Sequence, residues 1–153
     1  MSSFRERGGP WVVGQSILLL ATLFSVAFDR SPTVSMGFRG VALGLFLLGA
    51  LVGVAGTRAL GRNRTAFPQP VASGGLVQTG IYSWVRHPLY GSVILLAFGW
   101  AAGWGSWAAL LGALLLTIFL DAKARREERW LRARFPDYVG YCRRVRRLLP
   151  GIY

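Results

Sequence analysis

The sequence predicts an all-α integral membrane protein with about four transmembrane helices. Hydrophobic residues make up 53% of the 153 residues, and charged residues only 16%. This composition excludes an ordinary soluble domain and indicates the membrane class. Four apolar stretches follow one another at residues 11–28, 37–57, 89–102 and 106–120.

The length suits a single domain, so we treat residues 1–153 as one unit. Residues 1–60 hold two N-terminal spans of roughly 18 to 21 residues, enough to cross about 30 Å of hydrocarbon. Residues 61–153 hold a loop, a helical hairpin and a polar tail. The hairpin stretches are shorter, and whether they cross fully stays open. The last helix should continue to about Leu131, because no Gly or Pro intervenes before Pro136.

The basic residues predict the orientation of these helices. With four crossings both termini share one side, and all but two of the 18 Lys and Arg residues fall on that side. Arg30 and Arg39 are the exceptions. By the positive-inside rule, both termini, the central loop and the tail are cytoplasmic, with the helices in the inner membrane. A cleaved signal peptide is the alternative for the first stretch, but residues 28–30 make a poor cleavage site.

The net charge of +12 also bears on partners. Arginine clusters can neutralise nucleic-acid phosphates, but in a membrane protein, topology and attraction to anionic lipid headgroups are simpler explanations. We therefore expect membrane lipids as partners and no nucleic acid. One cysteine and one histidine leave too few soft ligands for zinc, so we expect no metal site.

Glycines of the second span leave the oligomeric state open. They permit close helix contact either within one subunit or between two. The residues concerned are Gly44, Gly49, Gly53 and Gly56.

Two polar clusters, at residues 80–90 and 123–128, flank the predicted hairpin and form the candidate site. Ionisable groups at a membrane edge are costly, so they suggest a site rather than packing. His87 should stand at the entrance of a helix that begins with Pro88, where free N–H groups favour an anionic ligand. A hairpin returns the chain to its starting side, so Glu127 and Glu128 should meet His87 in one pocket. Taken alone, the glutamates could equally form a solvated helix face.

Four motifs resemble the isoprenylcysteine carboxyl methyltransferase family, and phospholipid N-methyltransferases share a looser form of the pattern. The motifs are LVQTGIY at 76–82, RHPLY at 86–90, EERWL at 127–131 and FPDYVGY at 135–141. The resemblance covers about the second half of the chain. It implies an integral-membrane enzyme that uses S-adenosyl-L-methionine to methylate a hydrophobic or lipid-like carboxylate, thiol or amine.

The resemblance also implies roles for particular residues. The cofactor contacts would be Gly74, Gly75, Leu76, Val77, Tyr82, His87, Pro88, Leu89, Tyr90 and Glu127. Lys123 stands where the family often has a substrate-binding arginine, and lysine lacks the bidentate fork. The candidate catalytic residues are His87, Arg86 and Glu128. His87 or Glu128 could take a proton from an amine acceptor, whereas a carboxylate or thiolate needs no base.

Two other functions remain open from the sequence. Membrane steroid and sterol reductases also carry a Tyr...His-Pro-x-Tyr element but use NADPH. They look as though they place a glutamate shortly after that tyrosine. Here Gly91, Ser92 and Val93 occupy those positions. A non-enzymatic membrane protein could instead use its basic tail to bind anionic lipid or a partner. The Glu127-Glu128 pair favours the methyltransferase.

Overall fold

The computed structural model describes residues 3–29, 33–70, 73–151 and 153. Within these residues the chain is helical and contains no strand. The helices are α1 (Gly9–Asp29), α2 (Met36–Leu60), α3 (Pro88–Trp104), α4 (Trp107–Arg134) and α5 (Tyr138–Arg144), and two 3-10 turns, η1 (Gly61–Asn63) and η2 (Gly80–Ser83), lie in the central loop. The predicted all-α class is confirmed.

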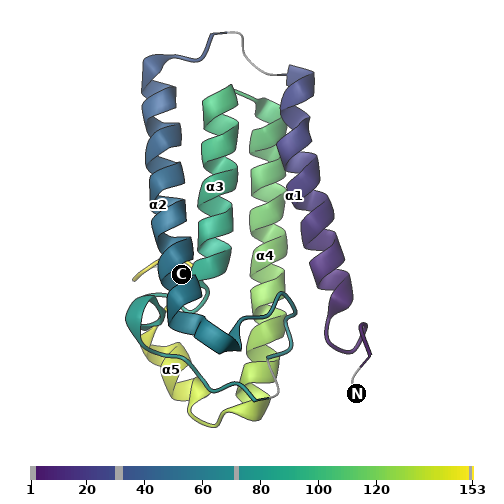
Figure 1. Cartoon of the computed structure of the whole chain (residues 1–153), viewed down its shortest axis with the longest axis vertical. Helices are drawn as coiled ribbons and strands as arrows, with labels where there is room; N and C mark the ends of the chain where they lie inside the picture. The colour runs from purple at the N-terminus through teal and green to yellow at the C-terminus, as the bar shows by residue number, and fades with distance from the viewer. Residues whose placement is uncertain (1–2, 30–32, 71–72, 152) are drawn as a thin grey trace.

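The four long helices lie side by side (Figure 1). α2 packs against α3, α3 against α4, and α4 against α1, so α1 and α2 flank the central hairpin. Helices α1 and α4, together with the segment 36–63, are long and apolar enough to cross a membrane, whereas α3 has only 17 residues. The length and apolar composition of these helices indicate a membrane protein.

Both termini, the central loop and α5 lie at the same end of the helix layer (Figure 1). We call this the basic end, because most of the arginines cluster in these segments. Arg39 lies near the start of α2 at the opposite end, and Arg30 falls outside the described residues. The shared location of the termini agrees with the arrangement expected for four helices.

Local signals set the ends of the hairpin helices. Pro88 is the first residue of α3, where its missing N–H removes no helical bond. Gly105 ends α3 with a left-handed φ of 60°, a conformation that glycine adopts without strain. Ser106 then caps α4 by accepting a 2.9 Å hydrogen bond from the Ala109 N–H. α4 runs unbroken to Arg134, so the predicted continuation to about Leu131 is confirmed and the helix extends three residues further.

Asp29 joins the end of α1 to the start of α4. Its carboxylate accepts a 2.7 Å hydrogen bond from the Ala108 N–H and a second from the Ser106 hydroxyl. A carboxylate at a helix N-terminus is favoured by the free N–H groups and by the helix dipole. Because α1 and α4 are far apart in sequence, this contact fixes how the first helix packs on the hairpin.

Small residues bring α2 and α3 into close contact. The Ser92 hydroxyl donates a 2.7 Å hydrogen bond to the Gly49 carbonyl, and a Cβ added at Gly53 would lie 2.6 Å from that hydroxyl oxygen. Gly56 similarly packs against Leu89. Glycines that the sequence left unassigned thus serve packing within one subunit, whereas Gly44 has no such neighbour within 4 Å.

Gly53→Leu should destabilise the protein, because Ser92 already fills the space that the leucine side chain would need. Overpacking of this kind costs about 1 to 3 kcal/mol. The matched control is Gly44→Leu on the same helix, which should melt close to wild type. Thermal unfolding in detergent, followed by circular dichroism, measures both. Equal destabilisation by the two changes would contradict the packing described for α2 and α3.

Candidate active site

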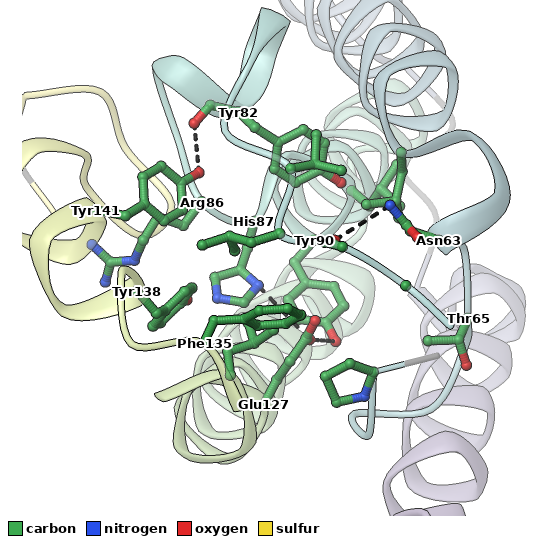
Figure 2. Close-up of a pocket in the computed structure, with 18 residues that line it drawn as sticks. Asn63, Thr65, Tyr82, Arg86, His87, Tyr90, Glu127, Phe135, Tyr138 and Tyr141 are labelled. Carbon is green, nitrogen blue, oxygen red and sulfur yellow. Dashed lines mark hydrogen bonds and ion pairs between the residues drawn. The ribbon is translucent and has the colours of Figure 1, made fainter. Parts of the chain in front are cut away.

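A pocket at the basic end gathers side chains from almost every element there (Figure 2). The end of α2, the central loop, the first turn of α3, the last turns of α4, and α5 all contribute. Its lining comprises Leu60, Asn63, Thr65, Pro70, Gly74, Gly75, Leu76, Val77, Tyr82, Arg86, His87, Leu89, Tyr90, Glu127, Leu131, Phe135, Tyr138 and Tyr141. The pocket therefore brings together the two clusters that flank the hairpin.

The structure brings most of the sequence-predicted site residues to this pocket. All the proposed cofactor contacts line it except Pro88. Pro88 instead lines a second, largely apolar cavity, together with Gly91 and Leu95 on a different face of α3. Arg86 and His87 line the first pocket, whereas Glu128 and Lys123 do not. The roles assigned to these residues stay predictions.

Glu127 presents a carboxylate to the pocket (Figure 2). Its Oε2 accepts a 2.7 Å hydrogen bond from the Tyr90 hydroxyl and lies 3.8 Å from His87 Nδ1. The rings of His87 and Tyr90 are stacked, with centroids 5.3 Å apart and planes 1° apart. No described residue donates a hydrogen bond to Glu127 Oε1. Glu127 is therefore fixed on one side and has a free acceptor on the other.

Glu128 has the opposite environment, although it is the next residue. Its side chain is 2% exposed and accepts hydrogen bonds from Arg86, with Nη2 at 2.8 Å and Nε at 3.0 Å. Arg147 adds two more, from Nε at 3.1 Å and Nη2 at 3.2 Å. His87 Nε2 lies 3.3 Å from Oε1. The carboxylate is thus a buried, fully paired anion and not part of a solvated helix face.

Arg86 joins α4 to the tail. Besides Glu128, its guanidinium donates to the carbonyl oxygens of Cys142 and Val145. Its backbone N–H donates to the Arg146 carbonyl at 2.9 Å, beside an isolated parallel bridge between Val85 and Arg146. With these bonds the Arg86 side chain, only 8% exposed, is already engaged within the protein.

Lys123 is buried behind the pocket. Its ammonium donates a 2.6 Å hydrogen bond to Gln15 Oε1 on α1 and a 3.0 Å bond to the Ala66 carbonyl in the central loop. It also lies 5.2 Å from the centre of the Tyr90 ring. Lys123 therefore ties α1 and the loop to α4. A substrate-binding role for it remains a prediction.

Several polar groups of the pocket lack protein partners. Tyr138 Oη is buried without a hydrogen-bond partner among the described residues, and no described residue accepts a bond from the N–H groups of 75–77. Burial raises the pKa of Tyr82, Tyr138 and Tyr141 well above the ordinary phenol value, so these hydroxyls stay neutral. Neutral phenols and free N–H groups suit a polar or anionic ligand.

Sequence reasoning missed several residues around the pocket. Asn63 and Thr65 line it from the segment that follows α2, and Asn63 Nδ2 donates a 3.3 Å hydrogen bond to the Gly75 carbonyl. No motif marks them, and only their polarity next to a membrane span could have drawn attention. Arg147 was one of many tail arginines, with nothing to single it out. Within the described part of the chain, no group of three or more His, Cys, Asp or Glu residues could hold a metal ion.

Comparisons with known proteins identify the family of the chain. A 79-residue segment is 39% identical to the cobalt-zinc-cadmium resistance protein CzcN of Cupriavidus metallidurans. That match covers 50% of this chain but only 36% of the relative, so the chain spans about a third of that protein's length. The model of the family described as phospholipid methyltransferase matches residues 38–138, well over half of the chain and both polar clusters. The predicted resemblance is confirmed, and the chain belongs to the phospholipid methyltransferase family.

Proposed function

We propose that the protein is an integral-membrane methyltransferase that uses S-adenosyl-L-methionine and acts on a hydrophobic or lipid-like acceptor. The observation that carries the proposal is the pocket of Glu127. It is lined by a carboxylate with one unpaired oxygen, by aromatic rings and by residues 75–77, whose N–H groups have no acceptor among the described residues. Family membership supports methyl transfer. The cofactor and the acceptor class rest on the chemistry of the pocket and on its place beside the membrane helices.

The groups that line the pocket fit the parts of this cofactor. Glu127 Oε1 could accept hydrogen bonds from ribose hydroxyls or from the amino group. The N–H groups of 75–77 could hold the carboxylate, and the orphaned Tyr138 hydroxyl could donate to a ring nitrogen or an oxygen. The Tyr82 ring offers a face to a cation, an attraction worth about 0.5 to 2 kcal/mol.

When bound, the cofactor supplies a methyl group on a positively charged sulfur. The residues of the chain then have three tasks, which are to align the acceptor, to exclude water and to stabilise charge. The buried rings that line the pocket serve the second task. His87 can also hold a proton, because its Nδ1 has no hydrogen-bonded partner and it lines the pocket. An amine acceptor would need that step, whereas a carboxylate or thiolate would not.

Glu128 and Arg86 have less room to act in the chemistry. Glu128 and Arg86 form an ion pair, and Arg86 also donates to a carbonyl of the tail. We therefore assign both residues to stabilising the structure of the site rather than to proton transfer. A nicotinamide-dependent reduction is the second candidate, since the Tyr...His-Pro-x-Tyr element is shared. Family membership and the unpaired Oε1 of Glu127 favour methyl transfer.

The same proposal includes the orientation in the membrane. We place the basic end in the cytoplasm, where S-adenosyl-L-methionine is available, and the exposed tail arginines against anionic headgroups of the inner membrane. The acceptor would reach the pocket from the lipid between helices. Arg129, Arg143 and Arg146 are exposed and could serve the headgroup contact.

Glu127→Gln should weaken the binding of S-adenosylhomocysteine by about 10- to 100-fold, because the variant loses a charged acceptor. Isothermal titration calorimetry on the purified protein in detergent measures this. Asp137→Asn removes an exposed carboxylate at the start of α5 and is the matched control, expected to bind like wild type. Wild-type protein that binds NADPH saturably and S-adenosylhomocysteine not at all would support the reductase instead.

Glu128→Gln should unfold more easily by about 3 to 5 kcal/mol, since it leaves two buried guanidinium groups without their anion. Glu127→Gln, one residue away, should change stability little. Chemical denaturation of both variants in detergent compares them directly. If Glu127→Gln proved the more destabilising change, the two glutamates would have been assigned the wrong way round.

A further inference from the structure

Arg147 lies beyond the family-matched region, which ends at residue 138. Its side chain nevertheless contacts Glu128, the buried carboxylate next to Glu127. Its guanidinium donates from Nε and Nη2 to the two oxygens of Glu128, at 3.1 and 3.2 Å. The third nitrogen, Nη1, donates to Asp121 Oδ1 at 3.0 Å. The side chain is 17% exposed. Such a fork holds both its partners in a fixed plane, which a lysine could not do.

The same residue also holds the backbone of His87. The His87 N–H donates a 3.0 Å hydrogen bond to the Arg147 carbonyl, next to the bond between Arg86 N–H and the Arg146 carbonyl. His87 is therefore held at both ends. Its main chain is fixed by the Arg147 carbonyl, and its imidazole meets the carboxylate that the Arg147 guanidinium orients, with Nε2 at 3.3 Å from Glu128 Oε1.

This arrangement selects one form of the imidazole. Glu128 stays ionised between two guanidinium groups, so its Oε1 only accepts, and the proton of a neutral His87 ring belongs on Nε2. Nδ1 is then the acceptor, on the side of the ring nearer Glu127, at 3.8 Å from its Oε2. The stacked Tyr90 ring limits rotation of the imidazole. His87 Nδ1 is thereby left as an acceptor with a fixed orientation at the pocket.

We propose that Arg147 is a positioning residue, which fixes the tautomer and orientation of His87 through Glu128. The inference rests on the proposed function for its catalytic meaning, but the geometry it asserts can be tested without any reaction. Arg147 itself does not line the pocket. Its effect on methyl transfer should therefore pass through His87 and appear in the turnover rate more than in cofactor affinity.

The test uses the full chain in detergent micelles with 15N-labelled histidine. His87 is the only histidine of the sequence, so its two ring nitrogens give an unambiguous NMR signal. In the neutral imidazole of wild-type protein we expect the tautomer protonated at Nε2 to dominate. Arg147→Met should shift the signal toward a mixture of tautomers, Arg147→Lys should restore it in part, and Arg143→Met, an exposed arginine on α5, should leave it unchanged.

A second measurement links the geometry to the reaction. With an amine acceptor, whose proton His87 would take, Arg147→Met should lower kcat by about 10- to 100-fold, as expected for a slightly misplaced group, with S-adenosylhomocysteine affinity within about threefold of wild type. If Arg147→Met does not fold, Asp121→Asn replaces it, because this change frees the guanidinium on one side and keeps its charge. A smaller shift of the same imidazole signal is then expected.

The inference is overturned if the His87 signal of folded Arg147→Met, or of Asp121→Asn in its place, matches wild type. It is overturned equally if cofactor affinity falls as steeply as kcat, since that would indicate general damage to the pocket. Failure of the proposed function looks different. Wild-type protein would then bind no S-adenosylhomocysteine, while the imidazole signal would still report on Arg147.

Discussion

The site depends on one buried carboxylate, that of Glu128. Taking an ion out of water costs several kcal/mol, and the cost is recovered only by close, well-directed partners. Here the partners are Arg86 before α3 and Arg147 in the tail, while α4 supplies the carboxylate. Three segments distant in sequence must therefore assemble together before the anion is tolerable. Once assembled, they fix His87 at the pocket, next to Glu127, which Tyr90 holds at Oε2 and whose Oε1 has no donor among the described residues.

The membrane helices are assembled by a different principle. Between helices in lipid there is little hydrophobic driving force, so close approach at small residues supplies the packing energy. Gly49 and Gly53 meet Ser92 in this way, and Gly112 meets Thr22 between α4 and α1. Between α3 and α4 the core again includes small residues, Ala97 and Ala113, packed with Leu116. The ends of α3 and α4 bring His87 Nδ1 to 3.8 Å from Glu127 Oε2 at one pocket.

Much of this could be predicted from local sequence signals. Pro88 and Gly105 mark helix ends through their own backbone preferences, and hairpin geometry alone predicted that the two polar clusters would meet. The contrast between Glu127 and Glu128 could not be predicted, since adjacent residues point about 100° apart and the rotation of α4 decides which of them faces the pocket. The partners of Lys123 and the role of Arg147 depend on α1 and on the tail, whose positions no motif encodes.

We propose that S-adenosyl-L-methionine binds in the pocket beside Glu127, at the membrane edge. An experimental structure of the protein with S-adenosylhomocysteine tests it most directly. We expect density for the nucleoside and its amino-acid part between Glu127, Tyr82 and the loop 74–77, with Glu128 still paired to Arg86 and Arg147. Density in the apolar cavity beside Pro88, or a ligand bound away from Glu127, would contradict it.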